Sequence, residues 1–225
     1  MATRLYLPSS GTSALNSLVD DSGWDEVSGT FFRAPMSITK TDTALTDFYS
    51  ALSVGGQYNA IFAQWVSAPL ADDYSFTTSD TIDFVAKVIE DATENDTYWG
   101  YKGRVVSNTG SEVIGSFASG LTVQRATEFP YSAASTRTMS YICAAVSAVA
   151  TDRLVFELGT YENWTGGGAT IRLGDPSGTG DFALTDSLTT DLCPWLELSP
   201  NLTFSEEEGE EAPVSSYMSL RRGMW

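Results

Sequence analysis

The sequence contains no histidine. Histidine is the base of Ser-His-Asp and Cys-His nucleophilic systems and the commonest ligand of zinc and non-haem iron, so these catalytic and metal sites are excluded. A phosphate-cradling glycine motif at a strand-to-helix junction is also missing. We therefore predict that the chain is not an enzyme and that it uses no cofactor.

Basic residues are scarce. Lys and Arg number 12 against 29 Asp and Glu, which gives a formal net charge of −17. Proteins that coat DNA or RNA gain affinity by neutralising phosphates with Lys and Arg, so we expect no nucleic-acid partner and, for the same reason, no anionic membrane. The acidity is explained either by solubility through self-repulsion or by attraction to a basic partner surface or to cations.

Cysteines and long apolar runs are few as well. Cys143 and Cys193 have no metal-ligand spacing, and two cysteines alone do not indicate a disulfide. The start of the sequence lacks the apolar core of a signal peptide, and no run approaches the roughly 18 residues of a membrane span. We expect the protein to be made and folded in the cytoplasm.

The sequence is instead rich in short runs that alternate apolar and polar residues and end at turn sequences. We expect strands over residues 4–7, 30–38, 60–67, 81–90, 98–106, 113–118, 138–150, 153–159, 169–174 and 195–199, and at most short helical turns over 13–19 and 43–52. The pattern predicts one all-β domain over residues 1–204. Its fold class is a jelly-roll-like β-sandwich of two mainly antiparallel sheets with extended termini.

The composition changes sharply after Phe204. Residues 205–213 are mostly glutamate, and like charges so close together do not pair in a sheet. We interpret them as an acidic spacer, followed by a C-terminal arm over 214–225 that binds a neighbouring subunit. The arm's candidate partner-binding residues are apolar anchors and two arginines: Tyr217, Met218, Leu220, Arg221, Arg222 and Trp225.

Carboxylates are the remaining route to catalysis or metal binding. Asp83 with Glu90, or Glu157 with Glu197, could meet across a sheet face as in glycoside hydrolases, although 29 acidic residues make accidental pairs common. Two acidic loops could hold calcium without an EF-hand spacing. They contain Asp91, Glu94, Asn95 and Asp96, and Asp175 and Asp181, respectively.

Aromatic residues could form a platform on which a sugar stacks. The candidates are Trp99, Tyr101, Tyr161 and Trp164. Aromatics on sandwich strands are more often part of the core, and Trp164, beside a run of glycines, is the best candidate for an exposed contact.

Short motifs spread over residues 3–204 carry a family resemblance. They are TRLYLPSSG at 3–11, Trp24, TKTDTALTD at 39–47, QWVSAPL at 64–70, RVVSN at 104–108, DRLVFELG at 152–159, RLGDP at 172–176 and PWLELS at 194–199. Together they resemble a family of tailed-bacteriophage virion structural proteins of jelly-roll type. The resemblance implies no catalytic residues and does not extend to the acidic stretch or the C-terminal arm.

We therefore expect a virion protein assembled in the host bacterial cytoplasm. The first expectation is a capsid decoration (cement) protein that stabilises the head lattice, most simply as a trimer. Its partners would then be copies of itself and other virion proteins such as the major capsid protein. The alternative is a tail or fibre module that binds host surface carbohydrate. A glycan-cleaving enzyme that uses carboxylates is the third and least favoured hypothesis.

Overall fold

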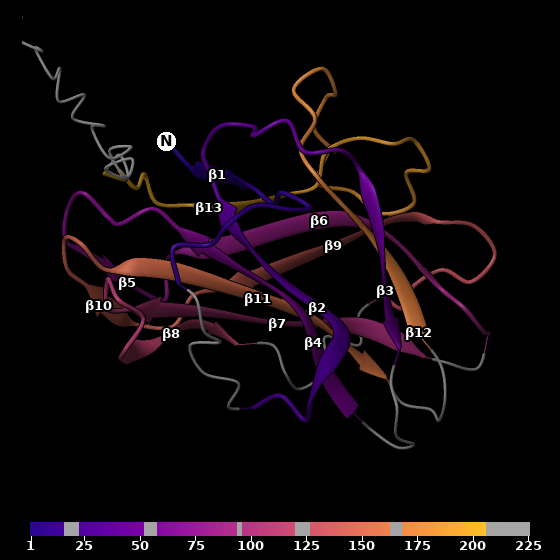
Figure 1. Ribbon diagram of the computed structural model, residues 1–225, viewed down its shortest axis with the longest axis horizontal. Coiled ribbons are helices and arrows are strands. Elements are labelled where there is room, and N and C mark those ends of the chain that lie inside the picture. The colour runs from indigo at the N-terminus through magenta and orange to yellow at the C-terminus, as the bar shows by residue number, and fades with distance from the viewer. Residues whose placement is uncertain (16–22, 52–57, 94–95, 120–126, 163–167, 206–225) are drawn as a thin grey trace, which may run out of the picture.

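The chain folds into two β-sheets that pack face to face (Figure 1). The structure is a computed structural model, and it describes residues 1–15, 23–51, 58–93, 96–119, 127–162 and 168–205. Over these ranges the chain forms strands and loops and no helix. None of the described segments is a helix long and apolar enough to cross a membrane.

The six-stranded sheet is built around β6 (Thr81–Glu90). One edge of β6 pairs with β13 (Trp195–Leu198) and then with β12 (Gly168–Leu173), and its other edge pairs with β9 (Ser135–Ile142). β1 (Thr3–Tyr6) extends the sheet from β13, and β3 (Thr46–Ala51) extends it from β12. All these pairings are antiparallel. Because β1 pairs with β13, the first and last described strands lie side by side.

The five-stranded sheet has the order β2 (Glu26–Met36), β4 (Tyr58–Ser67), β11 (Arg153–Glu162), β7 (Thr97–Val106) and β8 (Val113–Ser119). The β2–β4 pair is parallel and the others are antiparallel. A two-stranded sheet of β5 (Tyr74–Phe76) and β10 (Val146–Ala148) accompanies them. The predicted all-β sandwich of two mainly antiparallel sheets is confirmed.

The core lies between the two sheets and follows the period-two pattern of their strands. On β6 the alternate residues Ile82, Phe84, Ala86 and Val88 are buried in it, as the sequence predicts. Aromatic rings from the two sheets meet there, with centroids 5.0 Å apart for Phe84 and Trp99 and 5.8 Å for Phe84 and Phe156.

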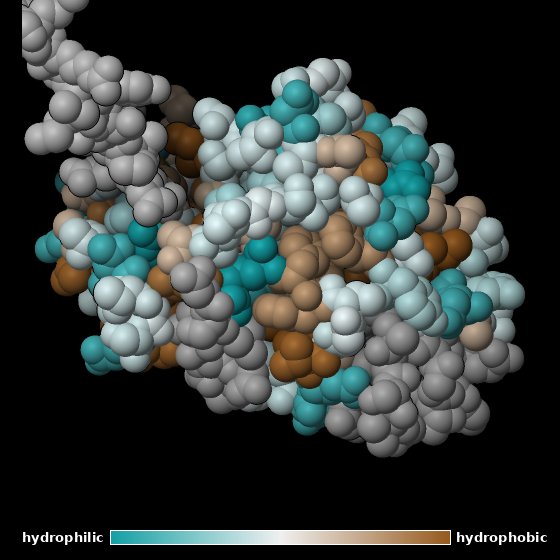
Figure 2. All heavy atoms as spheres, in the orientation of Figure 1, coloured by the Kyte–Doolittle hydropathy of each residue, from teal (hydrophilic) through white to brown (hydrophobic). Residues whose placement is uncertain are grey.

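Loops cover part of each outer face. Leu15 packs on Val66, Val106 and Val155 of the five-stranded sheet. On the six-stranded sheet Phe182 packs on Val85 and Trp195, with Leu188 and Leu192 beside them. The visible face of the molecule has hydrophobic residues between β2 and β3, bordered by hydrophilic ones (Figure 2).

Two local predictions are wrong. Residues 43–52, expected as a helical turn, contain strand β3, because Thr46–Ala51 pairs with β12 along its whole length. Residues 138–150, expected as one strand, are divided between β9 and β10, which pair with different partners. The other expected helical turn falls mostly outside the described residues. The boundary at residue 204 stays a prediction, and Phe204 forms the last described bridge, with Leu70.

Candidate functional site

A row of three side chains crosses the outer face of the six-stranded sheet where β3, β12 and β6 lie side by side. Tyr49 is in register with Thr170, and Thr170 is in register with Ile89. Their neighbours Phe48, Ile171 and Val88 point to the core, and side chains alternate along a strand. The row therefore faces away from the core, beyond the part of this face that Phe182 covers.

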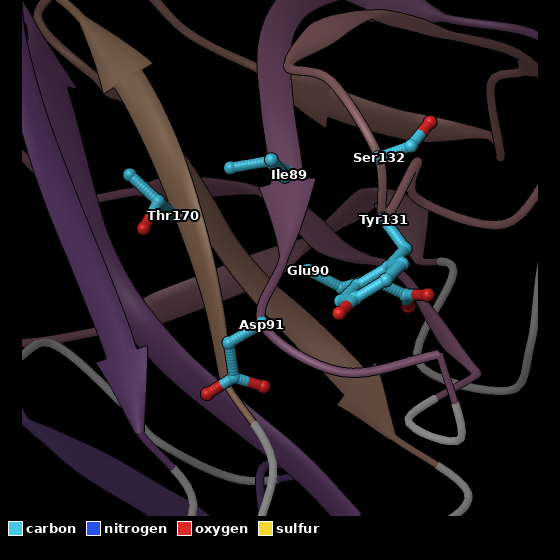
Figure 3. Close-up of a pocket in the computed structure, with 6 residues that line it drawn as sticks. All are labelled: Ile89, Glu90, Asp91, Tyr131, Ser132 and Thr170. Atoms are coloured by element: carbon cyan, nitrogen blue, oxygen red, sulfur yellow. The ribbon is translucent and has the colours of Figure 1, made fainter.

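A hollow of about 570 Å³ lies at this row. It is lined by Ile89, Glu90, Asp91, Tyr131, Ser132 and Thr170 (Figure 3). Thr170 and Tyr131 lie on opposite sides of β6, and Tyr131 comes from the loop that precedes β9. The hollow is open to solvent and lies within the size range of small-ligand sites.

Two tyrosines on either side of the hollow are exposed. Tyr49 is 44% exposed and Tyr131 is 48% exposed. The Tyr49 hydroxyl donates a 2.6 Å hydrogen bond to the Asp91 carboxylate, whose other oxygen accepts the Gly168 N–H at 3.0 Å. Since β12 separates β3 from β6, this bond directs the Tyr49 ring across the sheet. Asp91 thus fixes one aromatic ring and remains on the wall of the hollow.

The loop that carries Tyr131 is held by backbone hydrogen bonds to β6 and β7. The Glu90 N–H donates to the Pro130 carbonyl at 3.0 Å, and the Phe129 N–H donates to the Thr97 carbonyl at 2.8 Å. The side chain of Phe129 is buried in the core against Trp99. These contacts anchor the loop on both sides of Pro130 and leave the Tyr131 ring at the surface.

The hollow is acidic on its Glu90 side. The Glu90 side chain is buried and accepts a 3.3 Å hydrogen bond from the Thr97 N–H. Burial, together with the charges of Glu128 and Asp96, raises the pKa of Glu90 to about 7. Burial and the nearby Asp96 also raise the pKa of Glu128. Glu90 and Glu128 therefore hold their protons more tightly than ordinary glutamates do, next to the loop residue Tyr131.

The next row on the same face consists of compensated charges. Asp47, Arg172 and Lys87 are in register across β3, β12 and β6. Arg172 binds Asp47 through two nitrogens, at 2.6 and 2.7 Å, and Asp191 lies 2.7 Å from the Lys87 Nζ and 2.5 Å from Arg172. Both cations are thus engaged by carboxylates.

A buried charge lies under the outer face of the five-stranded sheet. Glu157 on β11 is 0% exposed and accepts hydrogen bonds from Trp24 Nε1 at 2.9 Å and Gln64 Nε2 at 3.0 Å. Arg104 Nε forms an ion pair with it at 3.1 Å. Burial raises the pKa of Glu157, and these three partners partly offset that effect. Because the Glu157 side chain is fully buried among these partners, we assign it a structural role.

The carboxylate pairs expected for catalysis do not form. Glu157 belongs to the five-stranded sheet and Glu197 to the six-stranded one. Asp83 and Glu90 lie on opposite faces of β6, because side chains alternate along a strand and the two position numbers differ by an odd number. Asp83 is instead in register with Glu197 and accepts a hydrogen bond from Ser140 at 2.5 Å.

The two acidic loops considered for calcium use their described carboxylates internally. Asp175 is buried and accepts the backbone N–H groups of Thr41 and Thr43 at 2.7 and 3.0 Å. Asp181 pairs with Arg4 at 3.0 Å and Lys40 at 2.8 Å. Asp91 is bound as described above, and residues 94–95 lie outside the described chain. Within the described residues no group of three or more acidic or cysteine side chains could hold a metal.

The strand aromatics that were considered for a sugar platform are buried, which confirms the core assignment that the sequence favours. Trp99, Tyr101 and Tyr161 are all buried, and Trp164 lies outside the described residues. The six residues of the expected C-terminal arm, Tyr217, Met218, Leu220, Arg221, Arg222 and Trp225, also lie outside them. Both cysteines are buried and neither is in a disulfide, and burial raises the pKa of Cys143 to about 11.

Sequence reasoning missed Tyr49, Asp91 and Tyr131 as a group. A strand assignment for residues 46–51 would have put Phe48 inside and Asp47 and Tyr49 outside. The pairing that brings Tyr49 to Asp91 joins strands that are far apart in the sequence. A local sequence pattern therefore does not predict it.

No family model matches the sequence, and no curated protein matches it. Solved structures to which the chain is similar include an α-amino acid ester hydrolase, at TM-score 0.47 and 9% identity, over 90% of this chain and 36% of that one. A CocE/NonD family hydrolase from Staphylococcus aureus matches at TM-score 0.45 and 9% identity, over 89% and 36%. Infectious bursal disease virus Gx strain matches at TM-score 0.22 and 7% identity, over 72% and 38%.

The chain spans about a third of the length of these hydrolases. Their presence contradicts the prediction that the chain is not an enzyme, which rested on the missing histidine, and that prediction is wrong by this comparison. TM-scores below 0.5 at such identities transfer no activity and no site residue to this chain.

Proposed function

We propose that this chain is a structural protein of a bacteriophage particle and that its sandwich binds glycans of the host surface. One observation carries the proposal: the exposed rings of Tyr49 and Tyr131 flank a hollow lined by hydroxyl and carboxyl groups. Sugars present apolar C–H faces and rings of hydroxyls. Tyrosine offers an apolar ring with a polar tip, and carboxylates accept hydrogen bonds from hydroxyls.

The site also lies on a rigid support. Thr170 and Ile89 belong to paired strands near the middle of the sheet, and Asp91 is fixed by Tyr49 and Gly168. A preorganised surface loses little conformational entropy on binding. The virion context rests on the distributed sequence resemblance described above.

Binding of purified protein to envelope polysaccharide from the host bacterium tests the proposal. We expect Tyr131→Ala to weaken binding about tenfold, the effect of about 1.4 kcal/mol, and Tyr131→Phe to retain most of it because the ring remains. Tyr49→Phe should weaken binding by releasing Asp91. Ile142→Ala, which removes an exposed apolar side chain on another strand, is the matched control. Equal binding by wild type and Tyr131→Ala would contradict the proposal.

Capsid decoration is a second candidate, favoured by an apolar hollow at the end of β9. It measures about 570 Å³ and is lined by Thr78, Ser140, Tyr141, Ile142, Cys143 and Ala144. Ile142 is 60% exposed there, as expected of a contact to another subunit. A trimer or a complex with the major capsid protein would bury it. Sedimentation of wild type and Ile142→Asp tests this candidate: a wild-type monomer that also fails to bind empty heads would exclude it.

A further inference from the structure

The charges around the tyrosine-flanked hollow are strongly unbalanced. Glu90 and Asp91 line it, and Asp96 and Glu128 lie close enough to Glu90 to raise its pKa. Its lining, as described, contains no Lys or Arg. A ligand in the hollow therefore meets a negative potential that the acidity of the whole chain reinforces.

Among the described residues, the lysine and arginine side chains beside the hollow are engaged by other groups. Lys87 and Arg172 are paired with Asp47 and Asp191 in the adjacent row. Arg137 donates to the carbonyls of Glu128 and Thr136 and to the Ser135 hydroxyl. An acidic sugar would be repelled in this setting.

The aromatic rings also favour a positively charged ligand. A cation over the face of a tyrosine ring is attracted by the ring quadrupole, and the Tyr131 ring stands at the hollow beside Glu90 and Asp91 (Figure 3). The Asp91 carboxylate, the Glu90 carboxyl group and the exposed Tyr131 ring border the space that a sugar substituent would occupy. Protonated amines match this combination because they donate to carboxylates and contact rings.

We infer that the hollow selects glycans carrying protonated amines, that is, amino sugars without N-acetylation, over neutral and acidic glycans. The inference rests on the proposed glycan-binding function and adds the charge class of the ligand. Asp91 supplies the carboxylate that accepts hydrogen bonds from the amine. The Tyr131 ring supplies the apolar and cation-binding surface.

The experiment compares three short oligomers of equal length on the full chain by calorimetry: glucosamine, its fully N-acetylated counterpart, and galacturonate. The measurement is made at mildly acidic pH, where the sugar amines are protonated. We expect the glucosamine oligomer to bind roughly tenfold more tightly than the N-acetylated one, and galacturonate to bind most weakly. Asp91→Asn should remove most of the preference for the amine.

A polycation can also bind an acidic protein diffusely, and two variants separate that effect from the site. Asp72→Asn removes the same charge from an exposed carboxylate that bonds Thr203, and it should keep the full preference. Tyr131→Ala should weaken the binding of both glucosamine-based oligomers.

A preference for the amine that survives in Asp91→Asn and Tyr131→Ala comes from diffuse attraction and overturns the inference. Equal affinities for the two glucosamine-based oligomers, still lost in Tyr131→Ala, also overturn it and leave the proposed function standing. If none of the three binds, the inference fails, and binding to host polysaccharide then decides the proposed function separately.

Discussion

At the scale of single residues, the buried Glu157 carboxylate supports the largest stability prediction. Its partners are Arg104 on β7, Gln64 on β4 and Trp24 before β2. Glu157 therefore connects the Trp24 segment to the five-stranded sheet. Removing one member of a buried ion pair leaves the other charge buried without compensation, at a cost of about 3–5 kcal/mol.

We therefore expect Glu157→Gln to lower the free energy of unfolding by about 3 kcal/mol, measured by urea denaturation. Glu197→Gln is the control, because Glu197 is partly exposed and pairs with the partly exposed Arg4. Such pairs contribute about 1 kcal/mol or less. A similar decrease in the free energy of unfolding in the two variants would show that the buried Glu157 ion pair does not contribute more than the exposed one.

At the scale of elements, the sequence patterns located most strands but not their partners. β6 and β7 were predicted as strands because large apolar residues recur at every second position, as Ile82 and Phe84 or Trp99 and Tyr101 do. β3 was missed because one face of it carries Phe48 alone between short polar residues, and its strand state depends on pairing with β12. The candidate site depends on that same pairing, so it could not be predicted locally.

The close contact of β4, β11 and Trp24 gives a prediction at this scale. A Cβ at Gly159 would lie 2.1 Å from the Ala60 carbonyl oxygen and 2.5 Å from the Trp24 ring. We expect Gly159→Ala to cost about 1–3 kcal/mol, the usual effect of overpacking, and to shift tryptophan fluorescence as Trp24 is displaced. Gly178→Ala, where a Cβ meets nothing within 4 Å, should have neither effect. An unchanged unfolding midpoint for Gly159→Ala would contradict this packing.

At the scale of the whole molecule, buried carboxyl groups make stability depend on pH. Burial raises the pKa of Glu90 from 4.5 to about 7, and burial also raises those of Glu128 and Glu157. The folded state thus holds protons that the unfolded state releases. The stabilisation linked to Glu90 is complete below pH 4.5 and is lost as the pH rises to about 7.

Ion-paired carboxylates act in the opposite sense. The bond from Arg172 lowers the pKa of Asp47, and the bond from Lys87 lowers that of Asp191. Their contribution is present above the ordinary value of 3.8 and is lost as the pH falls below it. We expect the thermal unfolding midpoint to be highest in mildly acidic solution and to fall as the pH rises to about 7. Glu90→Gln should flatten that fall, and a midpoint that instead rises with pH would refute the account of Glu90.

The central claim is that the outer face of the six-stranded sheet at Tyr49, Asp91 and Tyr131 binds glycans. The most direct measurement is an NMR titration of the isotope-labelled full chain with host polysaccharide fragments. We predict that the backbone amide signals of Tyr49, Asp91, Tyr131 and Thr170 shift together with a single affinity, while those of β4 and β7 stay in place. Shifts confined to the five-stranded sheet, or no shifts at saturating glycan, would contradict the claim.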